Sequence, residues 1–210
     1  AAADSTALIL GESGTGKELA ARAVHDLSSR SAEPFTVVDC AAMSMTNFER
    51  EFFGEDARKS GSGWIHRGLV SRAEGGSLFL DEVSELDYAA QSSLLRFIES
   101  GVFRPLGADS ETSRDVRVIA SSNRDLLEEV RAGRLREDLY YRLQVLPVRL
   151  PPLRERIDDI PKLAAMILDR LAVETGKQFA PLSAKSEARL LSYAWPGNVR
   201  QLENLLRWVA

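Results

Sequence analysis

The sequence predicts an α/β fold, in which helices flank a parallel sheet, followed by a small all-helical part. Short apolar runs alternate with segments of helical periodicity as far as Leu150, and only helical periodicity follows. Between the two parts stand Pro151 and Pro152, which cannot donate ladder hydrogen bonds and favour an extended connector. We therefore expect an α/β domain over residues 1–152 and a small all-helical domain over residues 153–210.

The predicted elements follow one another in a regular order. Strands are expected at 7–10, 35–38, 78–80, 116–120 and 145–150, which makes a sheet of about five strands. Helices are expected at 18–27, 46–53, 89–98 and 125–130 in the first part, and at 160–171, 184–193 and 199–209 in the second. In such sheets the carboxyl ends of the strands open onto the ligand crevice.

Composition narrows the class of protein. The 210 residues are 44% hydrophobic and 28% charged, which is enough for a sizeable core. No apolar run has the ~20 residues of a membrane span, so we expect a cytoplasmic protein without membrane contact. The only cysteine, Cys40, excludes an internal disulfide and favours a small buried side chain after a strand. The net charge of -4 argues that DNA binding belongs to a domain outside this chain.

A glycine-rich loop joins the first predicted strand to the first predicted helix, and it reads Gly11-Glu12-Ser13-Gly14-Thr15-Gly16-Lys17-Glu18. This is the context that the G-x-x-x-x-G-K phosphate-binding pattern requires. Successive backbone N–H groups hold a polyphosphate, and Lys17 reaches its outer phosphates. Glu18 stands where Ser or Thr usually binds Mg²⁺, so a magnesium ligand comes from elsewhere. The alternative is a glycine-rich turn without nucleotide.

Polar side chains end two of the predicted strands. Asp81 and Glu82 follow the strand at 78–80, and Asn123 ends the strand that begins at Val116. At this sheet edge Asp81 is suited to hold Mg²⁺ and Glu82 to orient an attacking water, while Asn123 is suited to sense the outer phosphate. By themselves the acids could form a solvated turn and Asn123 an ordinary turn, but their position after a phosphate loop favours the catalytic interpretation.

Six segments resemble the AAA+ domain of sigma-54-dependent transcription activators, also called bacterial enhancer-binding proteins: GESGTGKE, GGSLFLDE, SSNRDL, LREDLYYRL, LPPLRER and WPGNVRQLENL. The resemblance covers nearly the whole chain, and Glu18 is itself distinctive of the family. It implies an AAA+ P-loop NTPase fold that binds ATP and Mg²⁺ and hydrolyses ATP at the subunit interfaces of a hexameric or heptameric ring. It also implies a signal-responsive transcription activator that remodels the RNA polymerase holoenzyme containing sigma-54.

The resemblance assigns roles to individual residues. Lys17 matches the phosphate-loop lysine, Asp81 and Glu82 match the magnesium-binding and water-activating acids, and Asn123 matches the first sensor. These roles agree with those that the residues suggest by type and position.

Three arginines also match family positions. Arg136 and Arg142 match the pair offered as arginine fingers to the neighbouring subunit, and Arg200 matches the second sensor on the lid. The alternative for the pair is a set of surface charges bridging to Glu137 or Asp138. For Arg200 the alternative is a charge in the first turn of an exposed helix, where the helix dipole disfavours a cation unless an anion is near.

The sigma-54 contact loop departs from the family pattern. Members carry Gly-Ala-Phe-Thr-Gly-Ala there, whereas residues 55–68 of this chain contain no phenylalanine. This departure argues against a productive sigma-54 contact. The segment is basic through Arg58, Lys59, His66 and Arg67, which leaves open contact with DNA or another polymerase surface, or a solvated loop.

A second departure is Asp39, where the family often has an Asn that holds the catalytic glutamate. A carboxylate close to Glu82 would repel it and raise the pKa of one of the two groups.

Two functions of different kinds remain. The first is an ATP-hydrolysing domain of a transcriptional regulator that acts on RNA polymerase at promoters. The second is a module that senses ATP or a cyclic dinucleotide and works with the housekeeping polymerase without remodelling sigma-54. Other AAA+ activities, such as protein unfolding, are compatible with the fold but not with the six family-specific segments. A fold by itself does not determine function.

Overall fold

A computed structural model of the chain describes residues 4–43, 45–56 and 65–209. The chain divides into two compact units. Ala1–Leu10 and Glu18–Val148 form an α/β unit, while Gly11–Lys17 and Arg149–Ala210 form a helical unit. The glycine-rich loop thus groups with the helices that follow the sheet, which the sequence analysis did not anticipate. Each unit is described by itself below.

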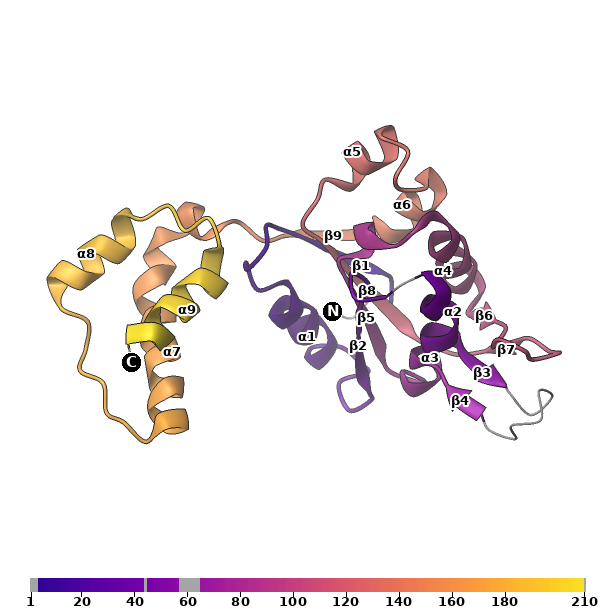
Figure 1. The fold of residues 1–210 in the computed structure, drawn as a ribbon, viewed down its shortest axis with the longest axis horizontal. Helices are drawn as coiled ribbons and strands as arrows, with labels where there is room; N and C mark the ends of the chain where they lie inside the picture. Colours follow the sequence, from indigo (N-terminus) through magenta and orange to yellow (C-terminus); the bar gives the residue numbers. More distant parts are fainter. Residues whose placement is uncertain (1–3, 44, 57–64, 210) are drawn as a thin grey trace. The chain divides into compact units, whose positions relative to one another are not determined.

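A five-stranded sheet forms the centre of the α/β unit (Figure 1). Its strands are β1 (Ala7–Leu10), β2 (Phe35–Asp39), β5 (Ser77–Asp81), β8 (Arg117–Ser122) and β9 (Leu146–Arg149), in the order β2-β5-β8-β1-β9. The pairs β2–β5, β5–β8 and β1–β8 are parallel, as the sequence predicts. The carboxyl ends of β2 and β5 lie level, because Asp39 pairs in register with Asp81.

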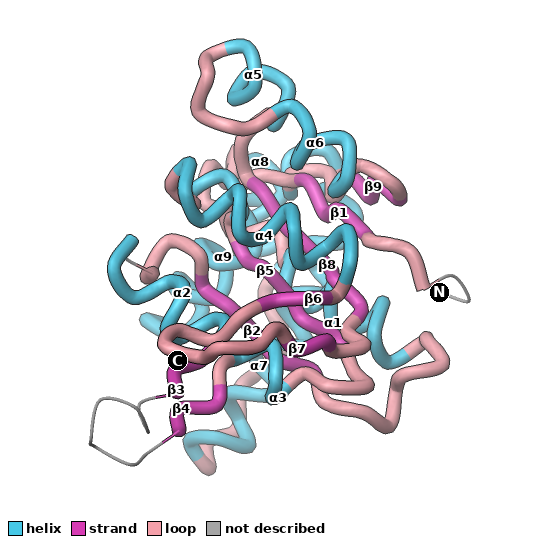
Figure 2. Tube along the Cα trace, turned by 90° about the vertical axis from the view of Figure 1, so that its right-hand side faces the viewer, coloured by secondary structure: helices cyan, strands magenta, loops and turns pink. Residues whose placement is uncertain are grey.

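Helices cover both faces of this sheet. The helices of the unit are α1 (Lys17–Asp26), α2 (Met45–Phe53), α3 (Leu69–Arg72), α4 (Tyr88–Ser100), α5 (Leu126–Arg131) and α6 (Glu137–Leu143). Figure 2 shows α4 crossing the central strands β5 and β8, while Figure 1 shows α1 on the opposite side of the sheet from α2 and α4. This arrangement confirms the predicted α/β class.

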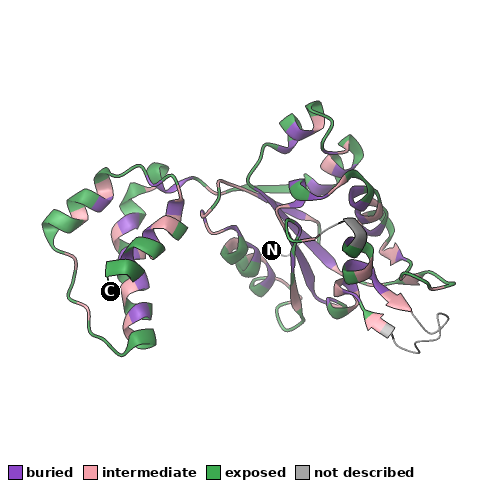
Figure 3. Cartoon of the chain, in the orientation of Figure 1, coloured by how far each residue is buried: buried purple, intermediate pink, exposed green. Residues whose placement is uncertain are grey.

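Aromatic side chains fill the core between the sheet and its α2–α4 face. Phe48 and Phe52, one helical turn apart in α2, stack with their ring centroids 4.7 Å apart. Phe97 of α4 meets Phe52 edge-on at 6.1 Å, and all three side chains are buried. Figure 3 shows the central strands as buried, whereas β9 is exposed along its length. Edge-to-face and offset pairs add about 0.5–1.5 kcal/mol each beyond burial.

Several short elements lie outside the sequence prediction. These are the hairpin β3 (Gly54–Asp56) and β4 (Ile65–Arg67), the hairpin β6 (Val102–Phe103) and β7 (Thr112–Ser113), the helices α3 and α6, and the 3-10 turns η1 (Val83–Glu85), η2 (Leu153–Glu155) and η3 (Ile157–Asp159). Main-chain hydrogen bonds from Asp56 to Leu106 and from Leu106 to Gly54, both 2.8 Å, tie β3 to the β6–β7 connection. Residues 57–64, which include the basic Arg58 and Lys59 of the predicted contact loop, lie outside the described residues.

The α-helices that follow the sheet in the helical unit are α7 (Ile160–Thr175), α8 (Ala184–Ser192) and α9 (Asn198–Val209), as the sequence predicts. They pack around Trp195, which is 2% exposed and whose indole N–H donates a 2.8 Å hydrogen bond to the carbonyl oxygen of Leu190. Burying both the ring and its polar N–H fixes this residue firmly. No helix among the described residues is long and apolar enough to cross a membrane.

Candidate nucleotide site and interface arginine

The glycine-rich loop has the backbone of a phosphate cradle. Gly14 and Gly16 have φ angles of 79° and 100°, a region that L side chains rarely adopt. Thr15 is buried, and its hydroxyl donates a 2.8 Å hydrogen bond to the carbonyl oxygen of Glu12. Lys17, the first residue of α1, directs its ammonium group back to the carbonyl oxygen of Gly11 at 3.0 Å. The lysine therefore lies over the loop, where it can meet a phosphate.

Glu12 connects this loop to the rest of the helical unit. Its carboxylate accepts two hydrogen bonds from Arg154, at 2.6 and 2.9 Å, and one from Asn198 at 3.2 Å. The Arg154 guanidinium, followed by the Asn198 amide, lowers the pKa of Glu12 to about 2. Glu12 therefore stays ionised and acts as a fixed anchor between the loop and the residues around η2 and α9.

The start of α9 contacts the loop directly. The backbone N–H of Val199 donates a 2.9 Å hydrogen bond to the carbonyl oxygen of Gly14. Arg200 donates a 3.1 Å hydrogen bond to the Ser13 hydroxyl, so its guanidinium lies beside the loop and not in free solvent. Asn198 is fully buried with φ 51° and donates a 3.0 Å hydrogen bond to the carbonyl oxygen of Ser13. Arg200 is thus placed next to the loop that the sequence predicts to hold phosphate.

Glu18, the last residue of the predicted phosphate motif, differs from the others. Its side chain is exposed in the first turn of α1 and has no partner among the described residues. An acid in a first helical turn is favourable with respect to the helix dipole, which is a sufficient structural reason for Glu18.

In the α/β unit, the end of β8 holds the two acids that end β5. The Ser121 hydroxyl donates a 2.5 Å hydrogen bond to Asp81 Oδ1 and accepts one of 3.1 Å from the backbone N–H of Glu82. The backbone N–H of Asn123 donates a 2.8 Å hydrogen bond to Glu82 Oε2. Asp81, Glu82 and Asn123, which the sequence places at one sheet edge, are therefore brought together there.

Asp39 uses its carboxylate locally. Its Oδ1 accepts hydrogen bonds from the backbone N–H groups of Ala41, at 3.0 Å, and Ala42, at 3.2 Å. Cys40 is 1% exposed, as the sequence predicts, and burial raises the pKa of its thiol. The turn after β2 is therefore closed by the side chain of Asp39.

Arg136 is engaged within its own unit. Its guanidinium donates hydrogen bonds of 3.0 and 2.8 Å to Asp138 and of 3.0 Å to the hydroxyl of Ser92, and lies 5.2 Å from the ring centroid of Tyr88. The bridge to Asp138 that the sequence left open is thus present for this arginine. A forked pair of this kind holds an arginine in one place.

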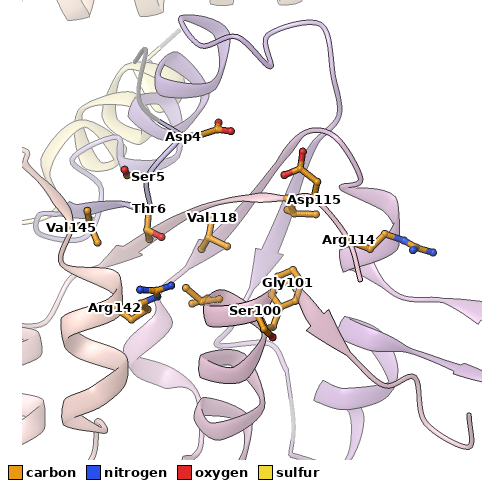
Figure 4. A pocket seen from close by; sticks show the side chains of 13 residues that line it. Asp4, Ser5, Thr6, Ser100, Gly101, Arg114, Asp115, Val118, Arg142 and Val145 are labelled. Atoms are coloured by element: carbon orange, nitrogen blue, oxygen red, sulfur yellow. The ribbon is translucent and has the colours of Figure 1, made fainter. Parts of the chain in front are cut away.

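Arg142 has a different environment, shown in Figure 4. It lines a cavity of ≈ 490 Å³ together with Thr6, Val118 and Val145, and its side chain points toward Thr6. Thr6 precedes β1, so this cavity lies by the amino ends of the strands, whereas Asp81 lies at a carboxyl end. The structure therefore places Arg142 at the opposite strand ends from Asp81 and Glu82 of its own chain.

The other charges that line this cavity are paired. Arg30 forms ion pairs with Asp4 at 2.6 Å and with Asp115 at 2.8 Å, and Arg114 pairs with Glu74 at 2.8 Å. Arg142, in contrast, is exposed and makes no hydrogen bond or ion pair with any described residue. Arg142 is thus the charged residue of this cavity for which the described part of the chain supplies no ion-pair partner.

Sequence reasoning missed three contributors to these sites. Ser121 directly follows the apolar run Val118 to Ala120 of β8 and belongs to the segment SSNRDL, which was used for its resemblance and not for contacts. Arg154 and Asn198 belong to the segments LPPLRER and WPGNVRQLENL, which were used for their resemblance and not for contacts. Partners so far apart in sequence are not indicated by local patterns.

The parallel sheet flanked by helices and the small unit of three helices define an α/β fold with a helical lid. The family model described as "Sigma-54 interaction domain" matches residues 1–149, and that described as "AAA+ ATPase lid domain" matches residues 154–210. The chain belongs to the AAA+ sigma-54 interaction domain family of bacterial transcription activators.

Curated relatives are regulatory proteins. The regulatory protein LuxO of Vibrio cholerae is 46% identical over 99% of this chain, and the Nif-specific regulatory protein of Enterobacter agglomerans is 48% identical over 97%. The chain covers 46% and 39% of their lengths, so it spans less than half of each.

A solved structure agrees in fold. Crystal structures of NtrX from Brucella abortus, in complex with ADP and with ATP, match 98% of this chain and 46% of theirs with a TM-score of 0.91 and 36% identity. The yeast Hsp104–ADP complex, at 18% identity and a TM-score of 0.66, shares the fold alone.

Proposed function

We propose that this chain is the ATP-hydrolysing domain of a bacterial transcriptional regulator that acts on RNA polymerase at promoters. The observation that carries the proposal is the pair Asp81 and Glu82, aligned by hydrogen bonds from the end of β8. Membership of the family supports the regulatory role. The NtrX structures with ADP and ATP support adenine nucleotides as ligands.

The glycine-rich loop takes the role of binding the polyphosphate. Its backbone N–H groups and the start of α1 meet the phosphate oxygens, while Lys17 neutralises the outer phosphates. Arg200, beside Ser13 at 3.1 Å, is placed to follow the phosphates from the start of α9.

The acids at the end of β5 take the chemical roles. Glu82 orients the attacking water, and the side chain of Asn123 holds the outer phosphate. The oxygens present fit Mg²⁺, because Asp81 is a carboxylate at a strand end and Mg²⁺ is ordinarily held by one or two carboxylates together with nucleotide phosphates. When bound, Mg²⁺ neutralises charge that develops on those phosphates.

Arg142 takes the role of completing the site of a neighbouring subunit. It lies away from Asp81 and Glu82 of its own chain and has no partner among the described residues. An arginine supplied in trans is worth about 10³ to 10⁵ in rate. Hydrolysis therefore requires a ring, which we propose to be hexameric or heptameric. Arg136 directly precedes α6, the helix that carries Arg142, and its ion pair with Asp138 holds the start of that helix.

Turnover of ATP at increasing protein concentration tests this function. We expect activity per subunit to rise with concentration as rings form, and Glu82→Gln to abolish turnover while nucleotide still binds. Nucleotide binding without turnover at any concentration would contradict the proposal and favour a sensing module, whose ligand, ATP or a cyclic dinucleotide, direct binding would then identify.

A further inference from the structure

Ser121 lies between the two acids of the proposed site and is fully buried. Its one hydroxyl serves both acids, because it donates to Asp81 Oδ1 at 2.5 Å and accepts from the backbone N–H of Glu82 at 3.1 Å. A donor–acceptor distance of 2.5 Å is in the range of a short charge-assisted O–H···O⁻ bond. The other carboxylate oxygen of Asp81 makes no hydrogen bond with a described residue.

The backbone at Glu82 needs such support. Its φ of 56° and ψ of 56° place a residue with a long side chain in the left-handed region. A non-glycine residue in this region is strained, and it persists where its surroundings hold it. Ser121 holds the N–H of Glu82, and the N–H of Asn123 holds its carboxylate, so the end of β8 fixes both ends of this residue.

We propose that Ser121 is a positioning residue for metal-dependent nucleotide hydrolysis. It holds one oxygen of Asp81, so that the other would be left to bind Mg²⁺, and it keeps Glu82 in the backbone conformation that presents its carboxylate. This inference rests on the proposed function and adds to it a residue that touches neither nucleotide nor metal. The nearest comparison within the chain is Ser122, whose hydroxyl contacts Ser84 and the main chain of Arg124 instead.

The test compares Ser121→Ala with Ser122→Ala, since both serines are buried in β8 and both variants lose one hydroxyl. Binding of Mn²⁺ to the ADP-loaded chain, followed by electron paramagnetic resonance, reports the metal without turnover. Loss of a partner that orients a metal ligand typically weakens metal affinity about 10- to 100-fold. We expect that loss for Ser121→Ala, with affinity for metal-free ADP unchanged, and wild-type behaviour for Ser122→Ala. Thermal unfolding verifies that both variants fold, and Ser121→Thr, which keeps the hydroxyl, should recover metal affinity.

Two outcomes separate this inference from the function beneath it. Equal metal affinity and equal Mg²⁺ dependence of hydrolysis in the two alanine variants would overturn the role of Ser121 while leaving the ATPase intact. A wild-type chain whose nucleotide binding does not respond to metal at all would overturn the proposed function, and this role with it.

Discussion

The backbone N–H of Asn123 donates a 2.8 Å hydrogen bond to the carboxylate of Glu82. We propose that Asn123 senses the outer phosphate and that Glu82 orients the attacking water. The main chain of Asn123 is therefore joined to the side chain of Glu82. Because the bond uses the backbone of Asn123, its side-chain amide remains available for a phosphate. This separation allows the two roles to be tested one at a time.

Replacing Asn123 by alanine keeps the backbone bond to Glu82 and removes only the side-chain amide. We expect ATP binding within a few-fold of wild type and turnover lowered about 10²-fold, the usual effect of losing one preorganised donor. Steady-state hydrolysis and equilibrium nucleotide binding measure the two effects. Asn47→Ala, at an exposed position on α2, is the control. Wild-type turnover by Asn123→Ala would exclude a role for this side chain.

The two loop glycines with positive φ should differ when each is replaced by alanine. Both variants incur the left-handed penalty of about 1–2 kcal/mol. A Cβ at Gly14 would also lie 2.4 Å from the carbonyl oxygen of Gly197, whereas one at Gly16 would meet nothing within 4 Å. We expect Gly14→Ala to lower the unfolding temperature of the nucleotide-free chain more than Gly16→Ala. Equal shifts would show that the contact between the loop and Gly197 contributes nothing.

The ion pair of Glu12 with Arg154 predicts a pH dependence of stability. The folded pKa of Glu12 is about 2, below the ordinary 4.5. A depressed folded pKa stabilises the protein above pH 4.5, and this contribution is lost as pH falls through 4.5 towards 2. The Glu12 side chain is 42% exposed, so the effect is reduced by solvent and salt.

We therefore expect the stability advantage of wild type over Glu12→Gln to shrink as the pH falls from about 5 towards about 2 at low salt. Urea unfolding at each pH measures it. Glu18→Gln serves as the control, because Glu18 has no partner among the described residues. Parallel curves for wild type and Glu12→Gln would contradict the anchoring role of this carboxylate.

The sequence predicts the sheet and most helices because their patterns are local. Strand β5 is a continuous apolar run ending in acids, and α9 repeats its apolar residues at helical spacing. The hairpins β3–β4 and β6–β7 are not predicted, because strands of two or three residues are too short to show an alternation of apolar and polar residues. Helix α6 is not predicted, because it has only seven residues and three of them, Glu137, Asp138 and Arg142, are charged, which leaves few apolar positions to show helical spacing.

The candidate site shows the same division. The identities of Lys17, Asp81 and Glu82 follow from motifs, since each motif places its chemistry at a strand end or helix start. The contacts that orient them do not, because Ser121 with Asp81 and Asn198 with Glu12 are brought together only by folding. The sequence also treated Arg136 and Arg142 as equivalent, whereas only Arg136 is bound by its own unit.

The central claim, that ATP is hydrolysed where two subunits meet, is tested most directly by mixing two inactive variants. In a ring of Glu82→Gln and Arg142→Ala subunits, an Arg142→Ala subunit keeps its own acids and receives Arg142 from a Glu82→Gln neighbour. Random mixing in equal amounts makes about a quarter of the interfaces complete. We predict that each variant alone is inactive and that the mixture recovers about that share of wild-type turnover. No recovery, in a mixture whose subunits exchange as shown by energy transfer between labelled chains, would contradict the claim.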